Sequence, residues 1–172
     1  MSLWGIILFC FYGATAAVAV AYGATLLHTS LGQSWFVAYL VAINVVAFLF
    51  YGFDKLFVSF LNAFKARVPE ALLIWGLAFP GGFVGAWLGM QVFSHKTGPE
   101  TFGFRVDFLK AFALAAAVVT VVMLIDRQGL ISFGALDALI EAGATFTLRV
   151  AQEVLAILGQ VLEVVVGVVR GG

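Results

Sequence analysis

Charged residues are scarce in this sequence. Only 10% of the 172 residues are charged, whereas 63% are hydrophobic. A soluble domain of this length needs a larger charged surface, so we expect a lipid bilayer to cover much of the chain. Nine basic and nine acidic side chains cancel, which argues against a nucleic-acid partner.

Cysteine and histidine are almost absent. The single cysteine, Cys10, excludes a disulfide within the chain and a cysteine-rich metal site. The two histidines, His28 and His95, are too few and too far apart for a structural metal site. No metal or cofactor is therefore predicted, although contact with a pigment, a haem or a quinone stays open. No nucleophile, zinc or phosphate-loop motif occurs either, which favours a non-catalytic protein.

Long apolar runs fill most of the chain. Residues 3–27, 34–53 and 108–125 are each long enough to cross about 30 Å of hydrocarbon as a helix. The first run lacks the basic start of a secretory signal and exceeds the length of its apolar core, so we expect it to be retained. The predicted fold is all-α, a polytopic integral membrane protein with three full transmembrane helices.

The third apolar run, residues 71–93, is interrupted near its middle by Pro80-Gly81-Gly82. Proline removes a backbone donor and glycine relaxes the backbone. Three basic residues precede this run and three follow it: Lys55, Lys65, Arg67, and Lys96, Arg105, Lys110. A full crossing would divide them between the two sides, against the preference of Lys and Arg for the cytoplasm. We therefore favour a re-entrant hairpin, with a kinked crossing as the alternative.

Small residues and one amide are predicted to pack the helices. Gly81, Gly85 and Gly89 recur every four residues and leave a groove for another helix, with Gly82 beside them. Asn44, inside the second apolar run, is expected to hydrogen-bond across helices.

Polar residues gather where the apolar runs end. With the hairpin, one cytoplasmic cluster is expected to contain Asp54, Lys55, Arg67, Glu70, His95, Lys96 and Thr97. Two interpretations stay open. The cluster is either a charged collar that fixes helix ends at the interface, or a binding site for an anionic headgroup or phosphate.

The order and spacing of these residues resemble a known family. The residues that support the resemblance are Asn44, Tyr51-Gly52, Asp54-Lys55, Arg67, Pro69-Glu70, Gly81-Gly82, Gly85, Gly89-Met90, His95-Lys96-Thr97 and Phe102. Over about residues 43–110 the sequence is similar to the small bacterial membrane proteins grouped as domain of unknown function 1294. The resemblance implies a multi-pass protein of the bacterial inner membrane and supplies no established activity. Unlike the family, residues 56–66 are nearly all apolar, which suggests contact with lipid or protein.

The chain continues beyond this core, so residues 1–126 are expected to form the membrane-embedded part and residues 127–172 an amphipathic helical extension. Within it, residues 131–147 are predicted to make a short helix broken near Gly143. In the rest of the extension, a narrow polar stripe runs along an otherwise apolar helix. We expect this helix to pack against other helices, and a fifth crossing of the membrane is the alternative. The candidates for contact with a partner are Leu155, Leu158, Leu162 and Val166.

Two functions follow as hypotheses. The first is an accessory or assembly subunit of a larger membrane complex, for example an energy-transducing one, with membrane lipids and other membrane subunits as partners. The alternative is a small membrane enzyme or binding protein for a phosphorylated or anionic lipid, which would use the polar cluster.

Overall fold

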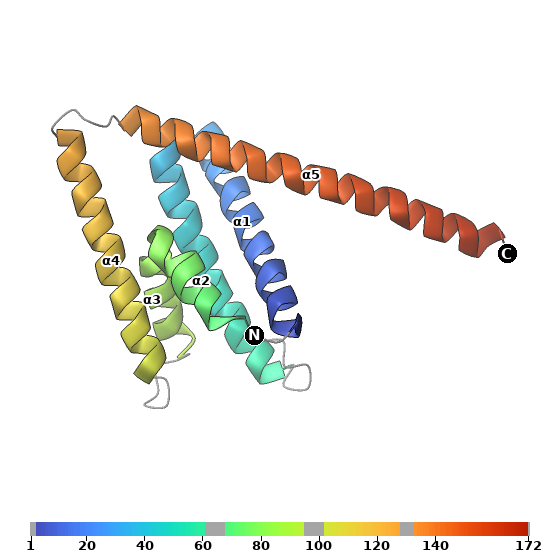
Figure 1. Cartoon of the computed structure of the whole chain (residues 1–172), viewed down its shortest axis with the longest axis horizontal. Helices are drawn as coiled ribbons and strands as arrows, with labels where there is room; N and C mark the ends of the chain where they lie inside the picture. Colours follow the sequence, from blue (N-terminus) through green and yellow to red (C-terminus); the bar gives the residue numbers. More distant parts are fainter. Residues whose placement is uncertain (1–2, 61–67, 95–101, 128–132, 172) are drawn as a thin grey trace.

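The structure, a computed structural model, describes residues 3–60, 68–94, 102–127 and 133–171. These residues form helices and no strand. The elements in chain order are α1 (Leu3–Leu31), α2 (Trp35–Phe60), η2 (Leu72–Gly82), α3 (Phe83–Val92), α4 (Phe102–Arg127) and α5 (Phe133–Gly171). α1 packs against α2, η2 and α3 lie between α2 and α4, and α5 crosses α1 and α2 near one end of the bundle (Figure 1).

The predicted all-helical fold is confirmed for the described residues. Within the residues that the structure describes, four segments are long and apolar enough to cross a membrane: Leu3–Leu31, Trp35–Leu56, Leu72–Val92 and Gly134–Glu163. α4 contains the remaining predicted segment, residues 108–125. Many large apolar side chains point outward on these helices, as expected where lipid replaces water.

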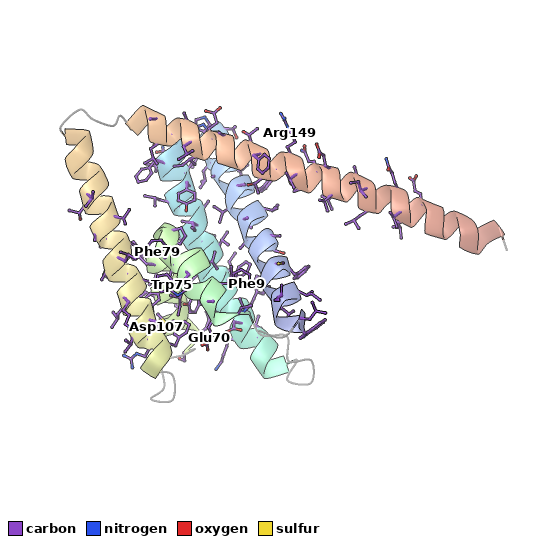
Figure 2. The ribbon with its side chains drawn as sticks, viewed as in Figure 1. Phe9, Glu70, Trp75, Phe79, Asp107 and Arg149 are labelled. Carbon is purple, nitrogen blue, oxygen red and sulfur yellow. The ribbon has the colours of Figure 1, made fainter. Side chains whose placement is uncertain are left out.

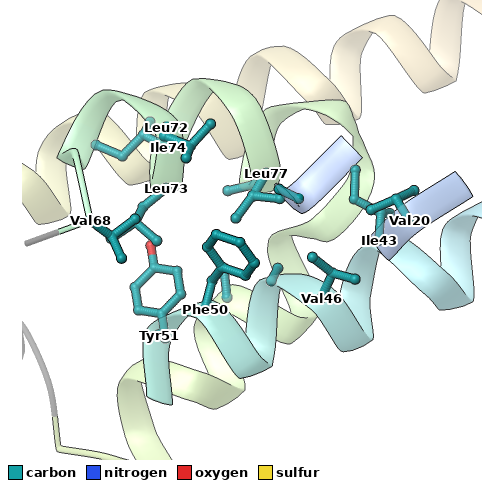
Figure 3. Packing of buried hydrophobic residues seen from close by; sticks show 14 of the residues in the cluster. Val20, Ile43, Val46, Phe50, Tyr51, Val68, Leu72, Leu73, Ile74 and Leu77 are labelled. Carbon is teal, nitrogen blue, oxygen red and sulfur yellow. The ribbon is translucent and has the colours of Figure 1, made fainter. Parts of the chain in front are cut away.

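The core lies where α1, α2 and η2 meet. Val20, Ile43, Phe50, Leu73 and Leu77 are buried there (Figure 3). α1 contributes mainly small buried residues, Ala16, Ala21 and Ala24. Small side chains let helix backbones approach closely, and that contact is what drives helix association in a bilayer.

The first two helices are joined by a short, well-capped turn. α1 ends four residues later than the predicted span, because hydropathy marks the hydrocarbon region and not the helix end. Gly32 has φ 62°, and its N–H donates to the carbonyl of His28 at 3.0 Å. This left-handed residue after a helix is a common glycine C-cap. The His28 ring stacks on Trp35 with 4.3 Å between centroids, which closes the turn.

The interrupted segment reverses direction. Its first arm, η2, is wound with π-helical bonds, a rare geometry concentrated at functional sites. The turn falls at Gly81, whose φ of 122° is readily adopted only by glycine. Both outer ends of the segment lie beside the last turns of α2, since Val68 bonds to Asp54 and Phe93 packs on Gly52. Figure 1 shows the two arms running in opposite directions.

The depth of this hairpin follows from its contacts with α2. The turn at Gly81 lies against Leu40 and Ile43, whereas the arm ends lie at Gly52 and Asp54. About ten residues of α2 separate these levels, or roughly 15 Å at 1.5 Å per residue. The hairpin is therefore about half as deep as the hydrocarbon layer of a bilayer.

The prediction of a break near Gly143 was wrong. α5 is one helix of 39 residues that passes through this position without interruption. A helical glycine costs only about 1 kcal/mol relative to alanine, which the neighbouring strong helix formers outweigh. The first half of α5 packs on α1 and α2 and buries Ala144.

Candidate functional site

The side chain of Asn44 holds the tip of the hairpin. Its Nδ2 donates to the carbonyl of Gly81 at 2.9 Å and to that of Leu40 at 2.7 Å. Its Oδ1 accepts from the N–H of Gly85 at 2.8 Å. A chain reversal within the membrane leaves backbone groups without helical partners, and lipid cannot satisfy them. One amide from α2 therefore bonds to the backbone on both sides of the turn.

The predicted packing glycines lie along the same contact. An added Cβ on Gly85 would overlap the carbonyl of Asn44, and one on Gly89 would lie 2.8 Å from Cβ of Tyr51. Gly82 is equally constrained, because its Cβ would lie 3.0 Å from the carbonyl oxygen of Ile43. Gly81 has a different role, since its positive φ allows the chain to reverse at the turn. α3 and α2 thus touch backbone to backbone, with no room for a side chain at these positions.

Tyr39 is a residue of the hairpin tip that sequence reasoning missed. Its hydroxyl donates to the carbonyl of Pro80 at 2.9 Å. The residues are 41 positions apart, and a tyrosine near a helix start is usually interpreted as an interfacial anchor. No local pattern could have revealed the pairing.

The mouth of the hairpin is built around Asp54. This carboxylate is only 1% exposed, and its Oδ1 accepts from the N–H of Val68 at 3.0 Å. Val68 directly precedes Pro69, whose carbonyl accepts the N–H of Leu72 at 2.9 Å and so begins the helix. A buried carboxylate is costly unless it is paired and hydrogen-bonded. Asp54 therefore ties the end of α2 to the start of the hairpin.

Tyr51 lies one turn before Asp54 and is completely buried. Its hydroxyl points toward Val68 and Leu73 on the first arm (Figure 3). Within the described part of the chain this hydroxyl has no hydrogen-bond partner. Sequence analysis used Tyr51 only in support of the family resemblance and did not assign it to the polar cluster.

The remaining residues of the predicted polar cluster are divided. Lys55 is half-buried next to Asp54, and Glu70 is exposed on the first arm. Figure 2 shows Glu70 and Asp107 at the same end of the bundle. Arg67, His95, Lys96 and Thr97 lie outside the described residues, so their place in the cluster stays a prediction. The described members of the cluster are two acids and one lysine, and this balance of charge does not by itself favour the binding of an anion.

Comparison with known proteins finds a family that matches the region of the hairpin. Residues 44–102 match the family described as "Protein of unknown function (DUF1294)". The "Uncharacterized protein YsdA" of Bacillus subtilis (strain 168) is 42% identical over 72 residues, which are 42% of this chain and 76% of that protein. The chain belongs to the DUF1294 family. No solved structure matches it significantly.

The DUF1294 segment coincides with the hairpin and its support. It begins at Asn44 and ends at Phe102, so it contains both arms of the hairpin, its mouth and the part of α2 from Asn44 onward. Tyr39, Leu40 and Ile43, which contact the tip, precede it. The resemblance predicted from sequence is confirmed. α1, α5 and all of α4 beyond Phe102 lie outside this segment.

α5 is attached to the bundle at its first turns. Asp137 Oδ1 accepts the N–H of Phe36 at 2.9 Å, so an acid from α5 caps the start of α2. An acidic group is stabilising there because the helix dipole is positive at its N-terminus. Sequence reasoning assigned no role to Asp137, since its partner lies 101 residues away.

Beyond Arg149, α5 leaves the bundle. It extends past α1, and Arg149 points away from the other helices (Figure 2). The predicted contact residues are exposed, namely Leu155 at 67%, Leu158 at 57%, Leu162 at 64% and Val166 at 39%. We call the stretch from Val150 to Val166 the free half of α5.

The histidines and acids give no sign of a metal centre in the described residues, where no group of three or more His, Cys, Asp or Glu side chains converges. His28 Nδ1 lies 2.7 Å from the carbonyl of Gln33, at the turn between α1 and α2. His28 is therefore engaged in closing that turn, and His95 lies outside the described residues.

Proposed function

We propose that the protein is a non-catalytic subunit of a larger complex in the bacterial inner membrane, and that the free half of α5 docks it there. One observation carries the proposal: this half projects from the bundle with large apolar side chains exposed along one broad face. The bundle alone leaves this surface uncovered.

The chemistry of the partner follows from the pattern on the free half. At 100° per residue, its polar side chains fall on one narrow stripe that includes Glu153, Gln160 and Glu163. The apolar remainder is wider than one neighbouring helix can cover. Peripheral membrane helices carry a broad basic face toward anionic lipid, whereas here residues 128–172 hold four acids and two arginines. The free half fits a membrane protein that offers an apolar groove bordered by Lys or Arg.

Docking should depend on the leucines of the free half. Replacing Leu155, Leu158 and Leu162 together with glutamine should lower the yield of copurified partner by roughly tenfold or more, because a few buried anchors dominate most interfaces. The measurement is native mass spectrometry after gentle detergent extraction. Leu139→Gln is the control, since Leu139 is 70% exposed on the attached half of the same helix.

Two results would count against docking. Full recovery of the partner with the triple variant would remove the free half from the interface. Purification of the unaltered chain as a monomer with bound lipid, and without a stoichiometric protein, would favour the alternative function in lipid binding.

The proposal includes a membrane topology. Lys55 follows Asp54 at the hairpin mouth, and Arg105 and Lys110 lie in the first turns of α4 beside Asp107, which Figure 2 shows at the same end of the bundle as Glu70. Basic residues favour the cytoplasm. The hairpin then enters from the cytoplasmic side and returns to it. α4 leaves the cytoplasm, and the free half of α5 runs along the outer side of the membrane.

Accessibility labelling should distinguish this topology from a kinked crossing. A cysteine introduced at Gln128 in a Cys10→Ser background should react with an impermeant thiol reagent in intact cells, whereas one at Gly98 should react only after lysis. Cysteine at Gly32, between α1 and α2, is the outward control. Protection at Gln128 together with reaction at Gly98 would show that residues 71–93 cross the membrane.

A further inference from the structure

A cavity of about 320 Å³ lies between α1, α2, η2 and α5. Its wall is formed largely by small or aliphatic side chains, with Ala16 and Val20 from α1, Ile43 from α2, Leu77 from η2 and Ala144 from α5. A volume of this size falls at the lower end of the range for small-molecule sites, which often lie between the helices of a bundle.

The polar side chains of the wall are already satisfied. Tyr39 donates its hydroxyl hydrogen to the carbonyl of Pro80 at 2.9 Å, and Thr147 donates to the carbonyl of Gly143 at 2.8 Å. Water is retained in a cavity when it finds two to four polar partners, and apolar cavities stay dry. A ligand with a polar ring or headgroup would likewise find no free side-chain donor. The interior therefore suits hydrocarbon.

The surroundings supply that hydrocarbon. The wall residues of α1 lie between Gly13 and Ala24, in the middle of a segment long and apolar enough to cross the membrane. A dry void forfeits dispersion contacts on its whole lining, so filling it from the bilayer is favourable. We propose that this cavity binds one acyl chain of a membrane phospholipid.

α5 completes the site, through its attached half and not through the half that docks a partner. Ile140, Gly143, Ala144 and Thr147 form its contribution to the wall. The bond from the N–H of Phe36 to Asp137 holds this part of α5 over α1 and α2. The site is thus independent of the proposed docking, and either proposal can fail alone.

Photocrosslinking of the full chain tests the site. The protein is reconstituted in phosphatidylcholine nanodiscs with a phosphatidylcholine probe that carries a diazirine in its acyl chain, and adducts are mapped by mass spectrometry. Adducts are expected in residues 13–24 and 140–147. Gly143→Leu should reduce them by roughly tenfold, equivalent to about 1.4 kcal/mol of chain binding. Adducts in residues 3–11, which do not line the cavity, should not change.

Two further variants keep the result interpretable. Gly13→Leu fills the cavity from α1, where an added Cβ would meet only Leu72 at 3.8 Å, and should give the same loss if Gly143→Leu fails to fold. Gly159→Leu is the control, because a Cβ there meets nothing within 4 Å and the position is outside the cavity wall. Cavity adducts that persist in both filling variants would overturn the site. Labelling by a polyisoprenoid probe but not by the phospholipid probe would overturn the acyl-chain assignment.

Discussion

Replacing Gly85 with alanine should lower the free energy of unfolding by about 2–6 kcal/mol, because the substitution disrupts a specific buried contact. The added methyl group would overlap the carbonyl of Asn44 and would lie 2.9 Å from its Cα. These are backbone atoms in the middle of a helix, so they cannot rotate away as a side chain can. α3 must therefore move off α2.

The movement has a second cost. Separation of the two helices breaks the bond from the N–H of Gly85 to Oδ1 of Asn44, which is 2.8 Å long. A buried donor left without an acceptor costs about 1–3 kcal/mol, in addition to about 1–3 kcal/mol for overpacking. The expected loss is the sum of these two effects and not a change in helix propensity.

Gly143→Ala is the matched control. Gly143 is also helical, but an added Cβ there meets nothing within 4 Å. The same substitution should raise stability by up to about 1 kcal/mol, because alanine has the higher helix propensity. Unfolding in a titration with sodium dodecyl sulfate gives both values. Equal effects at the two positions would show that α3 and α2 are not in backbone contact.

Sequence reasoning succeeded where the physical cause is local. Hydropathy located the apolar runs, because about 30 Å of hydrocarbon requires a fixed length of helix. Pro80-Gly81-Gly82 indicated an interruption, since a proline and a glycine with φ of 122° do not continue a regular helix. The spacing of Gly85 and Gly89 indicated a groove, because positions four apart share one face of a helix.

The pairing of distant segments could not be predicted from the sequence. The bonds from Tyr39 to Pro80 and from Phe36 to Asp137 join residues 41 and 101 positions apart. A helix pattern shows which face is apolar, but an apolar face fits lipid, another helix or a partner equally well. For the same reason the cavity under α5 could not be predicted, since it is the space that α1, α2, η2 and α5 leave unfilled where they pack together.

The continuity of α5 shows the limit of reasoning from single residues. Gly143 indicated a break, yet the neighbouring Thr147 bonds to its carbonyl at 2.8 Å and the helix continues. One glycine shifts the balance by about 1 kcal/mol, whereas the cooperative helix around it gains from every additional residue. The error came from treating a small local cost as decisive.

Asn44→Leu should lower the free energy of unfolding by about 2–4 kcal/mol and open the hairpin tip. Interhelical hydrogen bonds in membranes contribute on average only about 0.6 kcal/mol, because the separated helices find other partners. The tip differs from that average. Its partners are the carbonyl of Gly81 and the N–H of Gly85, backbone groups on the two sides of the turn that lie against α2. Removal of the amide leaves both without their partner, at about 1–3 kcal/mol each.

Local and global effects of this variant can be separated. Amide hydrogen exchange should accelerate in residues 81–89 while exchange in α4 stays unchanged, as expected if Asn44 acts on the turn alone. Asn44→Asp should retain the acceptor for Gly85 but lose both donated bonds, and should therefore be intermediate in exchange at Gly85. Thr120→Val is the control, because it removes a hydroxyl that bonds only within its own helix, to the carbonyl of Ala116. If Asn44→Leu were no more damaging than Thr120→Val, glycine packing alone would hold the hairpin, and the position at which the DUF1294 segment begins would have no structural role.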